Sequence, residues 1–199
     1  MPAKTANLVT VKHRVSIDQR VAANNHQSGV LWFTGLPGSG KSTLAIEVEQ
    51  KLFEKGWQVY VLDGDNVRQG LSADLGFSPE DRTENIRRIG EMAALFADAG
   101  FLVITAFISP YRADRELARK ASGKKFHEIH IAADVAVCED RDPKGHYARA
   151  RAGEIEEFTG VSAPYEAPAT PEFALDTATQ SVDDSVADLM AYIERKFSF

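Results

Sequence analysis

The sequence contains little that would suit a secreted, disulfide-stabilised or membrane protein. It has one cysteine, Cys138, so no intrachain disulfide can form, as is usual in a reducing cytoplasm, and we expect this side chain to be packed rather than catalytic. No stretch approaches the about 18 consecutive apolar residues that a membrane helix needs. The N-terminal segment mixes charged side chains and has no apolar block typical of a secretory signal. We therefore expect a cytoplasmic protein with no membrane partner.

An excess of basic residues is also absent. The formal net charge is −6, from 23 Lys and Arg against 29 Asp and Glu. Because nucleic-acid-binding domains usually carry a basic surface, we expect no nucleic-acid partner. A chain of 199 residues with 44 % hydrophobic content can bury one sizeable core, and we expect a single domain over residues 1–199.

One segment matches the pattern G-x-x-x-x-G-K-[ST] at every fixed position. It reads Gly35-Leu36-Pro37-Gly38-Ser39-Gly40-Lys41-Ser42. The glycines let the backbone curl until its N–H groups face phosphate oxygens, the lysine reaches the β- and γ-phosphates, and the serine hydroxyl can ligate Mg²⁺. The segment therefore predicts a P-loop, a binding site for a nucleoside triphosphate.

Short apolar runs alternate with helical patterns along the chain. The runs predict buried strands at residues 30–34, 58–62, 101–108, 126–132 and 173–176. Helices are predicted from the P-loop to Gly56, from the N-cap Ser78 to Gly100, at about 113–121, and from Ser181 onward. Residues 1–29 are expected to form an N-terminal arm with one short helical turn. This alternation predicts an α/β fold, a mainly parallel sheet with helices on both faces.

Polar residues follow three of the predicted strands, at Thr34, Asp63 and Ser109. Ligands of α/β sheets bind at the carboxyl ends of strands, so we expect these residues to meet in one cleft. Asp63 and Asp65 can hold Mg²⁺ through water or accept a proton from an attacking hydroxyl. The alternative is an ordinary turn, since Asp and Gly are common turn residues.

Charged and aromatic residues in the remaining loops supply further candidates. Arg82 and Asn85 share one face at the start of a predicted helix and form a plausible anion pocket. Residues 141–169 are long for a connection and predict a lid, in which Arg149 can cover the phosphates or pair at the surface with Glu154, Glu156 or Glu157. Phe77 and Phe158 lie in loops, where each can stack on a base or simply pack.

In one block after another, the chain resembles adenosine 5′-phosphosulfate (APS) kinases. The similar blocks are residues 31–42, 62–68, 75–78, 81–90, 105–112, 138–145, 150–155, 158–160 and 164–168, within a resemblance over roughly residues 7–195. The resemblance implies a P-loop kinase-like three-layer fold with a lid. It also implies transfer of the ATP γ-phosphoryl group to the ribose 3′-hydroxyl of APS, which gives 3′-phosphoadenosine 5′-phosphosulfate (PAPS), with Mg²⁺ as cofactor.

Site residues follow from matching this chain to the family's motifs. ATP binding is expected at Gly35, Leu36, Pro37, Gly38, Ser39, Gly40, Lys41, Ser42, Thr43 and Arg141. APS binding is expected at Asp63, Asp65, Arg68, Phe77, Arg82, Asn85, Ile108, Ser109, Arg149 and Phe158. Catalytic roles are expected for Lys41, Asp63 and Ser109, and metal binding for Ser42 and Asp63. The resemblance further suggests a homodimer and a functional link to ATP sulfurylase.

Two features of the resemblance affect the expected mechanism. The family has been assigned a phosphoserine at the position of Ser109, but no neighbouring base is evident to activate it, so we expect direct in-line attack by the 3′-hydroxyl. The chain also departs from the family at Pro37, usually Ser, and at Ala148, usually Lys in the lid. The alternatives are a catalytically weakened partner domain or a related P-loop metabolite kinase. A GTPase is disfavoured because the [NT]-K-x-D signature is missing.

Overall fold

A computed structural model describes residue 9 and residues 11–199. In this part of the chain, five parallel strands form one sheet in the order β2-β3-β1-β4-β5. Their bounds are β1 Gly29–Thr34, β2 Val59–Asp63, β3 Leu102–Ala106, β4 Phe126–Ala132 and β5 Phe173–Asp176. The predicted strands and the parallel sheet are confirmed. The third strand is shorter than predicted because the chain leaves the sheet after Ala106 and reaches a left-handed backbone conformation at Ser109.

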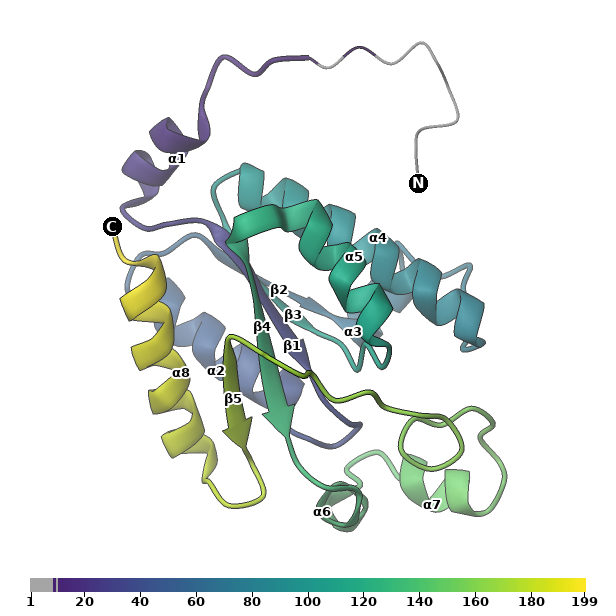
Figure 1. Ribbon diagram of the computed structural model, residues 1–199. Helices are drawn as coiled ribbons and strands as arrows, with labels where there is room; N and C mark the ends of the chain where they lie inside the picture. The colour runs from purple at the N-terminus through teal and green to yellow at the C-terminus, as the bar shows by residue number, and fades with distance from the viewer. Residues whose placement is uncertain (1–8, 10) are drawn as a thin grey trace.

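Helices cover both faces of the sheet (Figure 1), with α2 and α8 on one face and α4 and α5 on the other. Their bounds are α2 Lys41–Glu54, α4 Pro79–Asp98, α5 Arg112–Ser122 and α8 Val182–Phe197. The predicted N-cap Ser78 is confirmed, since its side chain accepts from the Asp81 N–H. The last helix begins at Ser181 as predicted, and this serine is also an N-cap, because it accepts from the Asp184 N–H. No helix within the described residues combines the length and apolar character needed to cross a bilayer.

Strand β1 lies in the middle of the sheet, and all its residues are buried. Its side chains alternate between the two faces, so Leu31 and Phe33 pack with α2 and α8, while Val30 and Trp32 pack with α4 and α5. A central strand of a parallel sheet is normally apolar on both sides for this reason. The P-loop that follows β1 is thus attached to the most deeply buried strand.

The N-terminal arm contains more structure than the single turn predicted. Helix α1 spans Ile17–Asn24, and Ser16 and Gln19 form a capping box in which each side chain accepts from the other's backbone N–H. The arm then packs through His26, which is fully buried and accepts a hydrogen bond from the Gln58 N–H at 2.9 Å. The predicted arm also includes residues 1–8 and 10, which lie outside the described residues.

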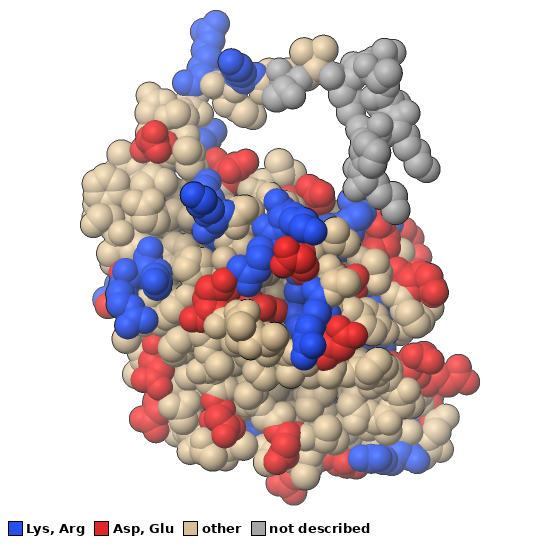
Figure 2. All heavy atoms as spheres, in the orientation of Figure 1, with Lys and Arg blue, Asp and Glu red and all other residues tan. Residues whose placement is uncertain are grey.

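Several short helices had no periodic pattern from which to predict them. They are α3 Gly64–Arg68, the 3₁₀ turn η1 Gly123–Lys125, α6 Val135–Arg141 and α7 His146–Arg151. Helices α6 and α7 lie beyond the carboxyl ends of the strands (Figure 1), where the lid was expected. On the face drawn in Figure 2, Lys and Arg side chains lie among Asp and Glu side chains. The exposed ion pairs of the molecule, such as that of Arg151 with Glu139, contribute little to stability.

Candidate active site

The P-loop joins β1 to α2 at the carboxyl edge of the sheet. Gly38 and Gly40 have φ values of 77° and 96°, in the left-handed region that favours glycine. A Cβ on Gly35 would collide with the carbonyl oxygen of Ile131 on β4. Glycine is therefore needed at all three positions for the loop to curl at the N-terminus of α2, where backbone N–H groups favour an anion.

The motif lysine, Lys41, is folded against the loop. Its Nζ donates to the carbonyl oxygens of Gly35 and Leu36 at 2.9 and 2.7 Å. Burial lowers the pKa of Lys41 to about 8. A triphosphate in the loop would offer this ammonium group charged oxygens in place of neutral carbonyls, so it would favour the protonated lysine.

A chain of polar contacts runs from the P-loop to the lid. Ser42 Oγ donates to Asp63 Oδ2 at 2.6 Å, and Asp63 Oδ1 accepts from the Asp65 N–H at 3.0 Å. The Asp65 carboxylate forms an ion pair with Lys144, which precedes α7. The alternative prediction for Asp63 was an ordinary turn, and its carboxylate does cap the turn that leads into α3. The same carboxylate also accepts the hydrogen bond from Ser42.

Ser42 and Asp63 supply the kind of oxygen ligands that Mg²⁺ prefers. Magnesium is usually held by one or two protein oxygens together with water and substrate phosphates, so this pair fits a metal that arrives with a nucleotide. Among the described residues, no three His, Cys, Asp or Glu side chains gather into a cluster that could hold a metal. A metal at Ser42 and Asp63 would therefore take its other ligands from phosphate and water.

Arg68 and Phe77 form the outer part of the predicted acceptor site. The Phe77 ring is 61 % exposed, and the guanidinium carbon of Arg68 lies 4.3 Å from its centroid. Arg68 is held in place because its Nη1 donates to the carbonyl oxygens of Leu75 and Gly76. An aromatic ring with this much exposed surface is available to stack on a planar ligand.

At the N-terminal end of α4, Arg82 and Asn85 lie together as predicted, but they differ in their contacts. Arg82 donates to the carbonyl oxygen of Phe77 at 2.9 Å, to that of Glu157 at 2.6 Å, and to Thr159 Oγ1 at 3.3 Å. It therefore holds the residues on either side of Phe158, one through its backbone carbonyl and the other through its side-chain hydroxyl. Asn85 is 4 % exposed, and its Oδ1 has no hydrogen-bond partner among the described residues, which leaves an acceptor for a polar ligand.

Ser109 lies beyond the end of β3 in a strained conformation, with φ of 42°. Its Oγ accepts from Trp32 Nε1 at 3.1 Å, and its carbonyl oxygen accepts from Arg115 Nη1 at 2.6 Å. The neighbouring Ile108 carbonyl accepts from Thr34 Oγ1 at 2.7 Å, so two predicted strand ends do meet. Ser109 is 2 % exposed, and no described Asp, Glu or His hydrogen-bonds to its hydroxyl. These contacts describe a positioned serine rather than an activated nucleophile.

The base of the lid packs directly on the P-loop. A buried apolar cluster joins one P-loop residue to the lid and its flanking helix, and consists of Leu36, Cys138, Tyr147, Ala150 and Phe158. Phe158 is 8 % exposed, so in this structure it packs, whereas Phe77 is open. Cys138 is fully buried, as expected for a packed residue.

Two of the lid arginines, Arg141 and Arg149, differ in their surroundings. Arg149 Nε donates to Glu154 Oε2 at 3.1 Å on the surface, which is the surface pairing that the sequence left open. Arg141 lies against the P-loop side, where it donates to the Thr177 carbonyl, and Thr177 Oγ1 donates to the Ser39 carbonyl at 2.9 Å. Arg141 is thus close to the predicted ATP site, and Arg149 is an exposed side chain of α7.

Several residues of this site were not predicted individually, among them Trp32, Arg115, Lys144, Tyr147 and Thr177. Lys144 and Tyr147 lie in or beside the segment that resembles the APS kinase lid. This resemblance was the one feature of the sequence that could have indicated them as site residues. Trp32, Arg115 and Thr177 act through contacts between distant parts of the chain. Local sequence patterns carry no information on such contacts.

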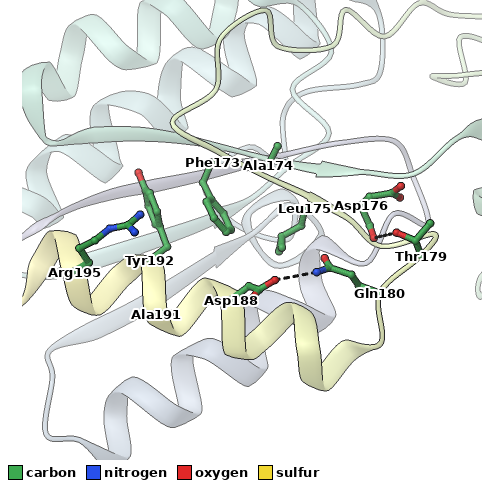
Figure 3. A pocket seen from close by; sticks show the side chains of 10 residues that line it. All are labelled: Phe173, Ala174, Leu175, Asp176, Thr179, Gln180, Asp188, Ala191, Tyr192 and Arg195. Atoms are coloured by element: carbon green, nitrogen blue, oxygen red, sulfur yellow. Dashed lines mark hydrogen bonds between the residues drawn. The ribbon is translucent and has the colours of Figure 1, made fainter.

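A separate groove of about 580 Å³ runs along the outer edge of the sheet between β5 and α8 (Figure 3). Its lining includes Phe173, Leu175 and Tyr192, and a hydrogen bond between Gln180 and Asp188 lies at one end. None of the predicted site residues lines it. The candidate active site is therefore distinct from this groove.

The chain is similar in sequence to adenylyl-sulfate kinases over most of its length. The Adenylylsulphate kinase family model matches residues 27–176. The adenylyl-sulfate kinase of Shewanella amazonensis is 53 % identical over 188 residues, 94 % of this chain and 95 % of that protein. The adenylyl-sulfate kinase of Bacillus pumilus is 56 % identical over 174 residues, 87 % of this chain and 88 % of that protein.

Solved structures agree with the sequence comparison. The APS kinase of Mycobacterium tuberculosis, in complex with AMPPNP and APS, has a TM-score of 0.81 and 49 % identity, covering 84 % of this chain and 98 % of that one. A gluconokinase from Sinorhizobium meliloti, with a TM-score of 0.55 and 17 % identity, covers 84 % of this chain and 93 % of that one, and shares only the fold. Together these similarities show that the chain belongs to the adenylyl-sulfate kinase family.

Proposed function

We propose that this protein transfers the γ-phosphoryl group of ATP to the ribose 3′-hydroxyl of APS and so forms PAPS for sulfate assimilation. The observation that carries the proposal is the contact between Ser42 and Asp63, which joins the P-loop to the segment that leads into the acceptor residues. A relative with 49 % identity was solved with both AMPPNP and APS, which supports the same two ligands here.

We infer a direct, in-line transfer. The 3′-oxygen of APS forms a bond to the γ-phosphorus while the bond from that phosphorus to the ADP oxygen breaks, and Asp63 orients the hydroxyl and accepts its proton. Lys41 and the P-loop N–H groups stabilise the charge on the β- and γ-phosphates. Mg²⁺, when bound at Ser42 and Asp63, neutralises part of the same charge.

On the acceptor side, we propose that Phe77 and Phe158 sandwich the APS adenine. Asn85 offers its unpartnered Oδ1 to a donor on the substrate. Further polar contacts and the wall of the site are proposed at Asp65, Arg68, Ile108 and Ser109. To reach the substrate, Arg149 would have to break its hydrogen bond with Glu154. Its guanidinium group would then replace the positive charge that the family usually has as a lysine at the position of Ala148.

The proposal extends to the setting of the reaction. A single domain working in the cytoplasm, as a homodimer and next to ATP sulfurylase as the source of APS, fits the family resemblance. The single cysteine and the use of ATP support the cytoplasm as the compartment.

Turnover with Mg-ATP tests the proposal directly. We expect PAPS formation from APS and no comparable phosphorylation of AMP, since AMP lacks the sulfate group. Activity on AMP without activity on APS would instead support a related metabolite kinase. Calorimetric binding of both ATP and APS without PAPS formation would support a catalytically weakened partner domain.

Ser109→Ala distinguishes direct transfer from a phosphoserine intermediate. We expect a partial loss of turnover, about tenfold, because the buried Trp32 Nε1 loses its acceptor and the strained segment relaxes. The measurement is the steady-state rate of PAPS formation. Ser185→Ala, a buried serine on α8, is the matched control and should leave the rate unchanged. A folded Ser109→Ala protein that makes no PAPS at all would favour the phosphoserine route.

Arg82→Ala should raise the KM for APS more than the KM for ATP. Arg82 fixes Glu157 and Thr159 around Phe158, so its loss loosens the acceptor side of the site while the P-loop is intact. Hydrogen bonds of charged groups are worth about 1.5–3 kcal/mol, so we expect a rise in KM for APS of about 10- to 100-fold. Arg87→Ala, which removes a surface ion pair with Glu84, is the control. A larger effect on ATP would reassign this end of α4 to the donor site.

A further inference from the structure

Tyr147, in the first turn of α7, connects the lid to the P-loop. Its side chain is 1 % exposed, and its hydroxyl donates to the carbonyl oxygen of Pro37 at 3.0 Å. Burial raises the pKa of Tyr147, so the hydroxyl stays protonated and acts as a donor. The two residues are 110 positions apart in the sequence, which makes this a tertiary contact between the triphosphate loop and the lid.

The ring of Tyr147 also contacts Phe158. The two ring centroids are 5.0 Å apart with an interplanar angle of 79°, an edge-to-face arrangement that aromatic pairs favour. Arg82 holds the residues before and after Phe158, through the Glu157 carbonyl and Thr159 Oγ1. One side chain therefore contacts the loop that binds ATP and the aromatic ring proposed to bind APS.

We infer that Tyr147 is a positioning residue that couples the two substrate sites, so that a nucleotide in the P-loop tightens the binding of APS and APS tightens the binding of the nucleotide. The inference rests on the proposed function, because it takes Phe158 as part of the APS site. A triphosphate fixes the P-loop, including the Pro37 carbonyl, and thereby fixes Tyr147 and the ring of Phe158. The second ligand then meets a site that is already ordered, which produces positive coupling without a large structural change.

Coupling between two sites must be reciprocal and usually lies between about 5- and 150-fold in affinity. We therefore expect saturating Mg-AMPPNP to tighten APS binding to the unmodified protein by at least about fivefold. Tyr147→Phe removes only the hydroxyl and keeps the ring on Phe158. In this variant we expect the dissociation constant for APS to become nearly independent of AMPPNP, with little change in APS affinity in the absence of nucleotide.

The test is isothermal titration of APS with and without Mg-AMPPNP, on the unmodified protein, on Tyr147→Phe and on Tyr192→Phe. Tyr192 is the matched control, because it is also buried and its hydroxyl hydrogen-bonds to His127 Nδ1 at 2.6 Å on the α8 side of the sheet. Loss of coupling in Tyr147→Phe alone, with similar thermal stability of the two variants, supports the inference.

Three outcomes would overturn it: no coupling in the unmodified protein, full coupling in Tyr147→Phe, or equal loss of coupling in both tyrosine variants. If APS fails to bind the unmodified protein at all, the proposed function itself is wrong. This outcome is distinguishable because it appears before any variant is compared.

Discussion

Lys41→Met should lower kcat for PAPS formation by at least about 100- to 1000-fold, the loss typical for one preorganised donor to a developing negative charge. The lysine is buried against the loop, and its Nζ donates to two loop carbonyls whose place as acceptors a triphosphate would take. Methionine fills much of the same buried volume, so the variant tests charge rather than packing. The measurement is the rate of PAPS formation at saturating ATP and APS.

The pH dependence of nucleotide binding gives a second readout for Lys41. Its pKa is lowered by burial to about 8 in the ligand-free protein, and bound nucleotide favours the charged form. Affinity for Mg-AMPPNP should therefore be constant below that pKa and weaken as the pH rises above it, by up to about tenfold per unit. Lys41→Met should lack this decline, because no proton is taken up at position 41.

Lys51→Met on the exposed surface of α2 is the control for both measurements. It should keep the rate of PAPS formation and the pH dependence of the unmodified protein. A near-normal rate in Lys41→Met would show that the triphosphate binds elsewhere, and the whole arrangement of the cleft would then have to be revised.

Structural features that depend on a few neighbouring residues could be predicted from the sequence alone. The strand that precedes the P-loop, the N-cap Ser78 and the start of the last helix at Ser181 are short-range features, and the structure has them where they were predicted. The Ser16–Gln19 capping box was equally local, but it was missed because the arm was judged by its weak apolar pattern alone.

The contacts that shape the candidate site are mostly long-range. The Tyr147 contact with Pro37 and the Arg82 contact with Glu157 join segments separated by 110 and 75 positions. Their formation depends on how the lid folds back against the P-loop, and no periodicity in the lid encodes that path. For the same reason, the sequence could suggest both roles for Arg149 but could not decide between substrate and Glu154.

Family resemblance supplied the acceptor residues, and the structure adds what each of them contacts. Asp65, for example, was predicted as an APS ligand, and here it forms an ion pair with Lys144. APS binding at Asp65 would then release or reposition that lysine. The Ser42–Asp63 contact is made directly between two protein side chains.

Asp63→Asn should be at least as damaging as the loss of Lys41, because in the proposed transfer the same carboxylate holds the metal and accepts the proton of the attacking hydroxyl. Its Oδ2 accepts from Ser42 Oγ, and its Oδ1 caps α3 through the Asp65 N–H. Asparagine keeps one oxygen for the cap but removes the negative charge and the ability to accept the hydroxyl proton. We expect kcat to fall by about 100- to 10,000-fold, the usual contribution of a positioned base, with a smaller change in ADP affinity measured without Mg²⁺.

The control for Asp63→Asn is Asp176→Asn at the end of β5. Like Asp63, Asp176 is the last residue of its strand, and it caps a turn because its Oδ1 accepts from the Ala178 N–H at 2.9 Å, but it is outside the proposed site. If the two variants lost activity equally, the effect would be one of turn stability. If Asp63→Asn alone lost kcat while its α3 cap and thermal stability were kept, charge at this position would be needed for the transfer itself. The P-loop would then be only the donor half of a site that Asp63 completes.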